Sequence, residues 1–165
     1  MFLKGKAILL SETNSFLNER PLTPDDAGEV LTLQRAAYAT EAQLYNDPFL
    51  PAMTQSLVEL RRELIGPGLA VRADSRLIGA VRWRLDGSMA HIGRLTVAPD
   101  WQGRGIGTRL LRAAEAASGA SFFELFTGHR SERNIRLYER EGYVFLRMEP
   151  INDRIELIFL RKSRT

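Results

Sequence analysis

The sequence of 165 residues contains no cysteine, only two histidines and only three lysines. Because cysteine is absent, the chain can form no disulfide, no thiolate nucleophile and no cysteine-ligated zinc site. A metal site would have to rely on carboxylates, and no such cluster is found, so we expect no metal cofactor. Long hydrophobic runs are also missing, since Ala7-Ile8-Leu9-Leu10 is too short for a signal peptide or a membrane-spanning helix. We therefore expect a cytoplasmic protein without membrane contact.

The charge is nearly balanced. The chain has 23 basic and 20 acidic residues, a net charge of +3, and 20 of the basic residues are arginines. These arginines are spread along the chain between glutamates, whereas a nucleic-acid-binding protein concentrates its basic residues in a stripe or cluster. We therefore do not expect a nucleic-acid partner, and the small excess of positive charge is more compatible with a small anionic ligand.

Hydrophobic periodicity and turn residues predict one domain with a mixed α/β sheet. Strands are expected over residues 6–11, 16–21, 69–73, 77–85, 89–97, 122–127, 143–148 and 154–160, and helices over 23–38, 54–65, 106–117 and 131–141. A loop with Pro48 and Pro51 separates the first two helices. Hairpin turns require antiparallel pairs and crossover helices imply parallel ones, so we expect a mostly antiparallel sheet flanked by about four helices. Residues 16–165 form the domain, and 1–15 are an N-terminal extension that could add a strand.

A glycine-rich turn follows the strand that ends at Val97. Its sequence is Gln102-Gly103-Arg104-Gly105-Ile106-Gly107-Thr108, and it opens a helix. Glycines allow backbone N–H groups to approach a ligand, and the N–H groups at a helix N-terminus can hold phosphate oxygens. A dinucleotide-binding fingerprint would need glycine at position 108, and a Walker P-loop would need a lysine, so neither common nucleotide motif fits.

The pattern Gln102-x-x-Gly105-x-Gly107 after Val97-Ala98-Pro99 resembles the pyrophosphate-binding signature of the GNAT superfamily of acyl-CoA N-acyltransferases. A second segment, residues 134–143, resembles the C-terminal motif of that family, in which a helix with Asn and Tyr leads into a Gly-aromatic strand start. The resemblance covers about residues 20–160. It implies a GNAT-like fold, acetyl-CoA as co-substrate, and direct acetyl transfer in a ternary complex to a primary amine of a small molecule or peptide.

The resemblance also implies where acetyl-CoA binds. The strand 89–97 should splay from the strand 122–127, so that the pantetheine arm inserts between them and pairs with backbone groups of the first strand. Arg104 and Arg109 are placed either to meet outer phosphates or to be solvated. The residues expected to bind the cofactor are Leu95, Val97, Gln102, Gly103, Arg104, Gly105, Ile106, Gly107, Thr108 and Asn134.

Three residues are candidates for moving protons during transfer. Tyr138 matches the general acid of the family, and the pKa values of a tyrosine and a thiol are close enough to share a proton; the alternative is a core tyrosine. The base is His91, Glu124 or a water chain. Period-two alternation places His91 on the strand face of Gly93, Leu95 and Val97, and the alternative is a structural histidine. Glu124 could instead pair with an arginine, and we expect His129 at the surface or beside the cofactor.

The acceptor is expected beside the first two helices. Tyr38, Glu41, Tyr45 and Asp47 gather there, and acids with aromatics suit a cationic amine, although a solvated loop edge has the same composition. The alternative function is a regulatory module that binds acyl-CoA without catalysis, because its phosphate-binding turn would be the same. Exposed apolar strands near the chain ends could pair two copies as a homodimer.

Overall fold

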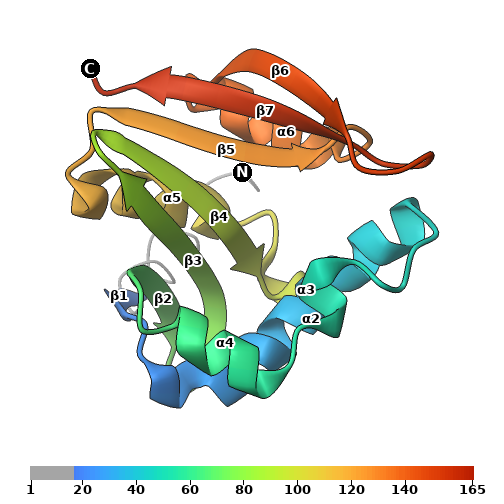
Figure 1. The fold of residues 1–165 in the computed structure, drawn as a ribbon. Coiled ribbons are helices and arrows are strands. Elements are labelled where there is room, and N and C mark those ends of the chain that lie inside the picture. The colour runs from blue at the N-terminus through green and yellow to red at the C-terminus, as the bar shows by residue number, and fades with distance from the viewer. Residues whose placement is uncertain (1–16) are drawn as a thin grey trace, which may run out of the picture.

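The computed structural model describes residues 17–165, in which seven strands form one mixed sheet (Figure 1). The elements in chain order are β1 (Asn18–Pro21), the 3₁₀ helix η1 (Pro24–Asp26), α2 (Ala27–Leu44), α3 (Pro51–Thr54), α4 (Leu57–Glu63), β2 (Gly68–Ala73), β3 (Arg76–Asp86), β4 (Met89–Val97), the 3₁₀ helix η2 (Pro99–Trp101), α5 (Ile106–Ser118), β5 (Phe122–Gly128), α6 (Glu132–Arg140), β6 (Val144–Pro150) and β7 (Glu156–Ser163). The predicted fold class is confirmed. The strand predicted over residues 6–11 and the extension 1–15 lie outside the described residues.

The strand order is β1-β2-β3-β4-β5-β7-β6. Within the described residues, all neighbouring strands are antiparallel except β4 and β5. The crossover through α5 makes that one pair parallel, as expected for a strand–helix–strand connection. No helix among residues 17–165 has the length and apolar character needed to cross a bilayer.

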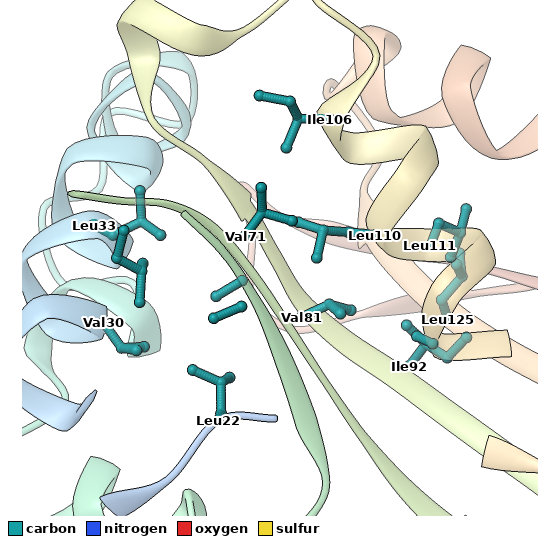
Figure 2. Packing of buried hydrophobic residues seen from close by; sticks show 14 of the residues in the cluster. Leu22, Val30, Leu33, Val71, Val81, Ile92, Ile106, Leu110, Leu111 and Leu125 are labelled. Atoms are coloured by element: carbon teal, nitrogen blue, oxygen red, sulfur yellow. The ribbon is translucent and has the colours of Figure 1, made fainter. Parts of the chain in front are cut away.

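Helices cover both faces of the sheet. Val30 and Leu33 of α2 lie on one side of the central strands, and Leu110 and Leu111 of α5 lie on the other (Figure 2). The close approach of α5 depends on Gly79 of β3, because a Cβ there would lie 2.8 Å from a methyl carbon of Leu110. This packing fixes the start of α5, and with it the glycine-rich turn, against the middle of the sheet.

The first helices differ from the prediction. The predicted helix ends at about residue 38, where the apolar repeat stops, but α2 continues to Leu44 because its last turn is held by contacts with a distant segment described below. Pro51, expected in a loop, begins the short helix α3, since proline fits the first position of a helix. The next helix, α4, begins separately after Ser56, whose side chain caps it by accepting from Glu59 N–H. The structure therefore has five α-helices among the described residues, against the predicted four.

Strands β4 and β5 pair only at their first three residues. The paired positions are Met89 with Phe122, Ala90 with Phe123, and His91 with Glu124. Beyond His91 the two strands diverge, as Figure 1 shows. The predicted splaying of the two strands is confirmed.

A β-bulge interrupts β4. Gly93 pairs with Arg82 of β3 and Thr96 pairs with Ala80, so β4 has one residue more than β3 between these pairs, and Arg94 takes a positive φ of 50°. The bulge reverses the alternation of side chains along the strand. Gly93 and His91 therefore lie on the α2 face, whereas Val97, which pairs with Gly79, lies on the α5 face together with Leu95. The prediction that all four share one face is wrong, because period-two alternation holds only in an unbroken strand.

Candidate active site

The glycine-rich turn presents free backbone N–H groups at the start of α5. Gly103 and Gly105 have φ values of 75° and 81°, which side-chain-bearing residues rarely adopt. Arg109 N donates to Gly105 O at 3.0 Å, so the N–H groups of residues 106–108 precede the first carbonyl they could bond within the helix. A Cβ on Gly105 would meet no atom within 4 Å, so space for a ligand lies directly over the turn. This is the geometry of an anion-binding helix N-terminus.

Gln102 and Arg133 brace this turn. Gln102 Nε2 donates to Val97 O at 3.2 Å, and its Oε1 accepts from Arg133 Nη1 at 2.8 Å. Arg133 belongs to α6, and its Nη2 lies 3.9 Å from the Cβ position of Gly103. Sequence reasoning missed Arg133. The signal was present, because Arg133 directly precedes Asn134 in the second motif, but only the fold brings α6 next to the turn.

The two arginines considered for the outer phosphates differ. Arg104 is exposed, and its guanidinium lies 4.6 Å from the ring centre of Trp101 at the edge of the turn. Arg109 instead forms an ion pair with Glu19 and donates to Leu17 O at 2.7 Å, which ties α5 to β1. Of the two, Arg104 is placed near the glycine turn with its charge accessible to a phosphate.

The edge of β4 that faces the opening carries backbone groups for a ligand. Ala98 N donates to Ile78 O on β3 at 2.8 Å. Because successive N–H groups point to opposite sides of a strand, those of Val97 and Leu95 point away from β3, toward the side where β5 has diverged. On the far side of the opening, Asn134 Nδ2 donates to Thr127 Oγ1 at 3.2 Å, which places Asn134 beside β5. These four residues therefore line the two sides of the β4–β5 opening.

Tyr138 of α6 is 7% exposed and forms no side-chain hydrogen bond within the described part of the chain. Among residues 17–165, Arg94 Nε is the one side-chain nitrogen or oxygen that is fully buried and has no hydrogen-bond partner. The Tyr138 hydroxyl also lacks a partner but is not in that class, so part of its surface is exposed. Burial, with the nearby charges of Tyr38 and Glu41, raises the pKa of Tyr138. The phenol is therefore neutral at physiological pH, and α2 and α6 bring Tyr38, Glu41 and Tyr138 together.

His91 and Glu124 face each other where β4 and β5 part. His91 Nδ1 lies 3.8 Å from Glu124 Oε1. Glu124 also accepts a hydrogen bond from Arg161 Nη2 at 2.9 Å and lies 3.6 Å from Arg147. Burial alone would raise the pKa of Glu124, but Arg161, Arg147 and His91 together lower it. Arginines thus hold the Glu124 carboxylate as an anion, as in the alternative that Glu124 pairs with an arginine. The His91 side chain is one-third exposed.

The four residues expected on the acceptor side have different surroundings. Glu41 Oε2 accepts a hydrogen bond from Ser131 Oγ at 2.5 Å, and Tyr45 OH lies 2.9 Å from Ser131 Oγ. Tyr45 is buried and also accepts from Arg130 N, so it joins the end of α2 to the start of α6. Asp47 Oδ1 accepts from Phe49 N in a loop. Tyr38 and Glu41 thus lie near Tyr138, whereas Tyr45 ties α2 to α6 and Asp47 holds its own loop.

His129 lies at the far end of β5. Its Nδ1 accepts from Glu156 N at 3.1 Å, and its ring centre is 5.8 Å from that of Tyr45. A pocket of about 430 Å³ lies between the end of α2 and the β6–β7 turn, and its lining includes Tyr45, His129, Arg130, Arg154 and Glu156. His129 therefore packs against β7 and contacts neither the glycine-rich turn nor Tyr138.

Residues 67–145 match the family model described as the acetyltransferase (GNAT) domain. No curated protein matches the sequence.

Several solved structures share the fold. The PaiA N-acetyltransferase from Thermoplasma acidophilum, solved in complex with coenzyme A, has 19% identity and a TM-score of 0.73 over 90% of this chain and 99% of that one. An acetyltransferase from Thermus thermophilus has 16% identity and a TM-score of 0.71 over 90% and 97%. The ribosomal-protein-S18-alanine N-acetyltransferase from Escherichia coli has 17% identity and a TM-score of 0.67 over 89% and 93%. At these identities the likeness establishes the fold.

Proposed function

We propose that the protein, whose residues 67–145 match the acetyltransferase (GNAT) domain model, moves an acetyl group from acetyl-CoA directly to a primary amine of a small molecule or peptide. One observation carries the proposal: the β4–β5 opening has the glycine-rich turn at one end and, beside it, the Tyr138 hydroxyl, which has no hydrogen-bond partner among residues 17–165. A protein that only bound acyl-CoA would have no use for that hydroxyl. The domain takes in residues 16–165, with 1–15 as an extension.

The residues around the opening fit acetyl-CoA. The N–H groups of residues 103–108 hold the pyrophosphate, and Arg104 and Arg133 add positive charge beside it. Leu95 and Val97 offer backbone groups to the pantetheine arm, and Asn134 offers its amide from the other side. When bound, acetyl-CoA supplies a thioester carbonyl that is already activated for attack by an amine.

The side chains then move two protons. His91 accepts the proton that the amine must lose, directly or through a water, because its ring is partly exposed on the α2 face. Tyr138 gives its hydroxyl proton to the departing sulfur, and its raised pKa keeps that proton in place until the sulfur carries charge. A backbone N–H of β4 near Val97 polarises the carbonyl. Glu124, held by Arg161, orients His91 and does not act as the base.

Calorimetric titration of acetyl-CoA into protein freed of bound CoA tests the proposal, followed by CoA release with a panel of amines. We expect micromolar binding that Gly105→Glu abolishes, because the new side chain would occupy the phosphate position and strain a φ of 81°. Gly87→Glu is the matched control, since Gly87 also has a positive φ of 57° and open surroundings but lies in the β3–β4 turn. Absence of binding by folded wild-type protein would overturn the proposal, and binding without turnover of any amine would favour the regulatory module.

We also propose that the edge strand β6 pairs two copies of the chain. It ends the sheet and exposes Val144, Phe145 and Met148 by 66%, 61% and 45%. An unpaired apolar edge is a template for the same strand of a second copy related by a two-fold axis. Sedimentation should find a dimer that Phe145→Asp dissociates, whereas Val58→Asp, at an exposed site on α4, leaves it intact. Monomeric wild-type protein would contradict this pairing.

A further inference from the structure

Arg94 occupies the bulge of β4, next to the opening between β4 and β5. The bulge gives it a φ of 50° and breaks the alternation of the strand, and its guanidinium lies on the α2 face beside the ring of Tyr38. Arg94 follows His91 by three residues, on the part of β4 that has lost its pairing with β5. Its charge therefore lies beside the proposed transfer site and not at the phosphate-binding turn, which begins after the end of the strand.

The guanidinium of Arg94 has no anionic partner. Its Nε is buried without a hydrogen-bond partner, and no hydrogen bond or ion pair joins Arg94 to any residue among 17–165. The guanidinium carbon lies 5.9 Å from the centre of the Tyr38 ring, a cation–π contact. Because Nε is the only nitrogen of Arg94 that is both buried and unpaired, the two terminal nitrogens have access to solvent. The charge of this guanidinium is therefore left without a carboxylate partner among residues 17–165, and a ligand anion can supply one.

A second arginine adds to the positive charge. The charge of Arg94 acts on Arg82, whose side chain is 11% exposed. Arg82 lies 3.2 Å from Glu63 and donates to Gln34 Oε1 at 3.3 Å, so its own charge is balanced. Within the described residues, Glu63 forms its ion pair with Arg82 and not with Arg94, and the Glu63 side chain is half exposed. One positive charge, that of Arg94, is therefore left for a ligand.

We propose that the acceptor is a free amino acid or a close analogue, whose carboxylate is bound by Arg94; this inference rests on the proposed N-acetyltransferase function. A guanidinium matches a carboxylate with two parallel hydrogen bonds, and the terminal nitrogens of Arg94 are free to form them. Tyr38 connects the two halves of the site, since it contacts Arg94 and also acts on Tyr138. A bound amino acid would thus place its amine beside Tyr138 and Glu41 and its carboxylate beside Arg94.

The same charges disfavour other acceptors. A polyamine has no group to neutralise Arg94 and would be repelled by it and by Arg82. An amine whose carboxylate is replaced by a carboxamide keeps its size but loses the charge. A site built to bind a group in this way discriminates strongly against the analogue that lacks it.

The test compares standard amino acids with their carboxamides as acceptors, with CoA release as the readout. We expect at least one amino acid to be acetylated with a kcat/KM about 100-fold above that of its carboxamide. Arg94→Gln should remove this preference mainly by raising KM for the amino acid, and Arg94→Lys should restore part of it. Arg84→Gln is the matched control, because Arg84 is an exposed arginine two residues along β3 from Arg82. Binding of acetyl-CoA should be unchanged in all three variants.

A second readout does not depend on turnover. The Nε–H signal of Arg94 in a nitrogen–proton correlation spectrum, identified by its loss in Arg94→Gln, should shift when the same amino acids are added and stay in place with their carboxamides. If amines without a carboxylate are acetylated equally well, and Arg94→Gln changes nothing, the inference is overturned while the acetyltransferase proposal stands. If no amine is acetylated, the Arg94 signal decides: an unchanged signal with every amino acid overturns the inference.

Discussion

Tyr45 at the end of α2 packs directly over Gly128 at the end of β5, so closely that a Cβ on Gly128 would lie 2.5 Å from Tyr45 Cζ. The tyrosine hydroxyl then meets Ser131 Oγ and Arg130 N at 2.9 Å each. Ser131 Oγ in turn donates to Glu41. This contact joins the helix that carries Tyr38 and Glu41 to the helix that carries Tyr138.

Gly128→Ala should therefore destabilise the protein by about 1–3 kcal/mol, because the methyl group must displace the Tyr45 ring. Urea unfolding measures the change. Gly28→Ala is the control: Gly28 lies in α2 with no atom within 4 Å of its Cβ position, so alanine should stabilise the helix by about 0.5–1 kcal/mol. Equal stability of Gly128→Ala and wild type would show that Tyr45 can move aside at no cost.

Tyr138→Phe should lower kcat about 100-fold and leave acetyl-CoA affinity unchanged, because it removes a proton donor and keeps the ring that packs in the core. Steady-state kinetics and calorimetry separate the two effects. Tyr143→Phe is a matched control, since Tyr143 is also buried and its ring centre lies 6.0 Å from that of Tyr138, but its hydroxyl donates to Glu115 of α5. It should lose stability and keep kcat. Unchanged turnover in Tyr138→Phe would remove Tyr138 from the acid role.

His91→Gln should lower kcat about 100-fold if His91 is the base, and added imidazole should restore part of the rate by supplying a diffusible base. A structural histidine would show no such rescue. His129→Gln provides the comparison, because His129 bonds Glu156 N away from the opening. Its kcat should match that of wild type.

The ion pairs of Glu124 predict a loss of stability in acid. The pKa of this carboxyl is lowered in the folded protein, so its contribution is fully present above its unfolded pKa of roughly 4.3 and is lost as the pH falls through the folded value. At pH 7, Glu124→Gln should lower the unfolding free energy by about 1 kcal/mol, a modest amount because Arg161 and Arg147 are about 40% exposed. Urea unfolding at pH 7 and at pH 3 should show the gap between wild type and variant closing in acid. A constant gap would contradict the assignment.

Much of the site was visible in the sequence because its signals are local. The strand end, the glycines and the start of α5 follow one another along the chain, and each is marked by residues that favour it. Asn134 and Tyr138 were found for the same reason, since they belong to one short helix. The helix α2 was predicted too short because its last turn contains few apolar residues and is held by Ser131, far away in the chain.

The sequence by itself determined the order of the elements, the mixed sheet and the glycine-rich turn, because these depend on periodicity and on backbone preferences within a few residues. Tertiary structure alone decided which side chains meet. It placed Arg133 on the glycine turn, turned Arg109 to Glu19, and set Glu124 among arginines. The bulge at Arg94 was also decided by tertiary structure, because β4 has an extra residue only in comparison with β3, the strand it pairs with. Long-range pairing thus decided which charged side chains lie beside the β4–β5 opening, because each charge is positioned by residues far away in the chain.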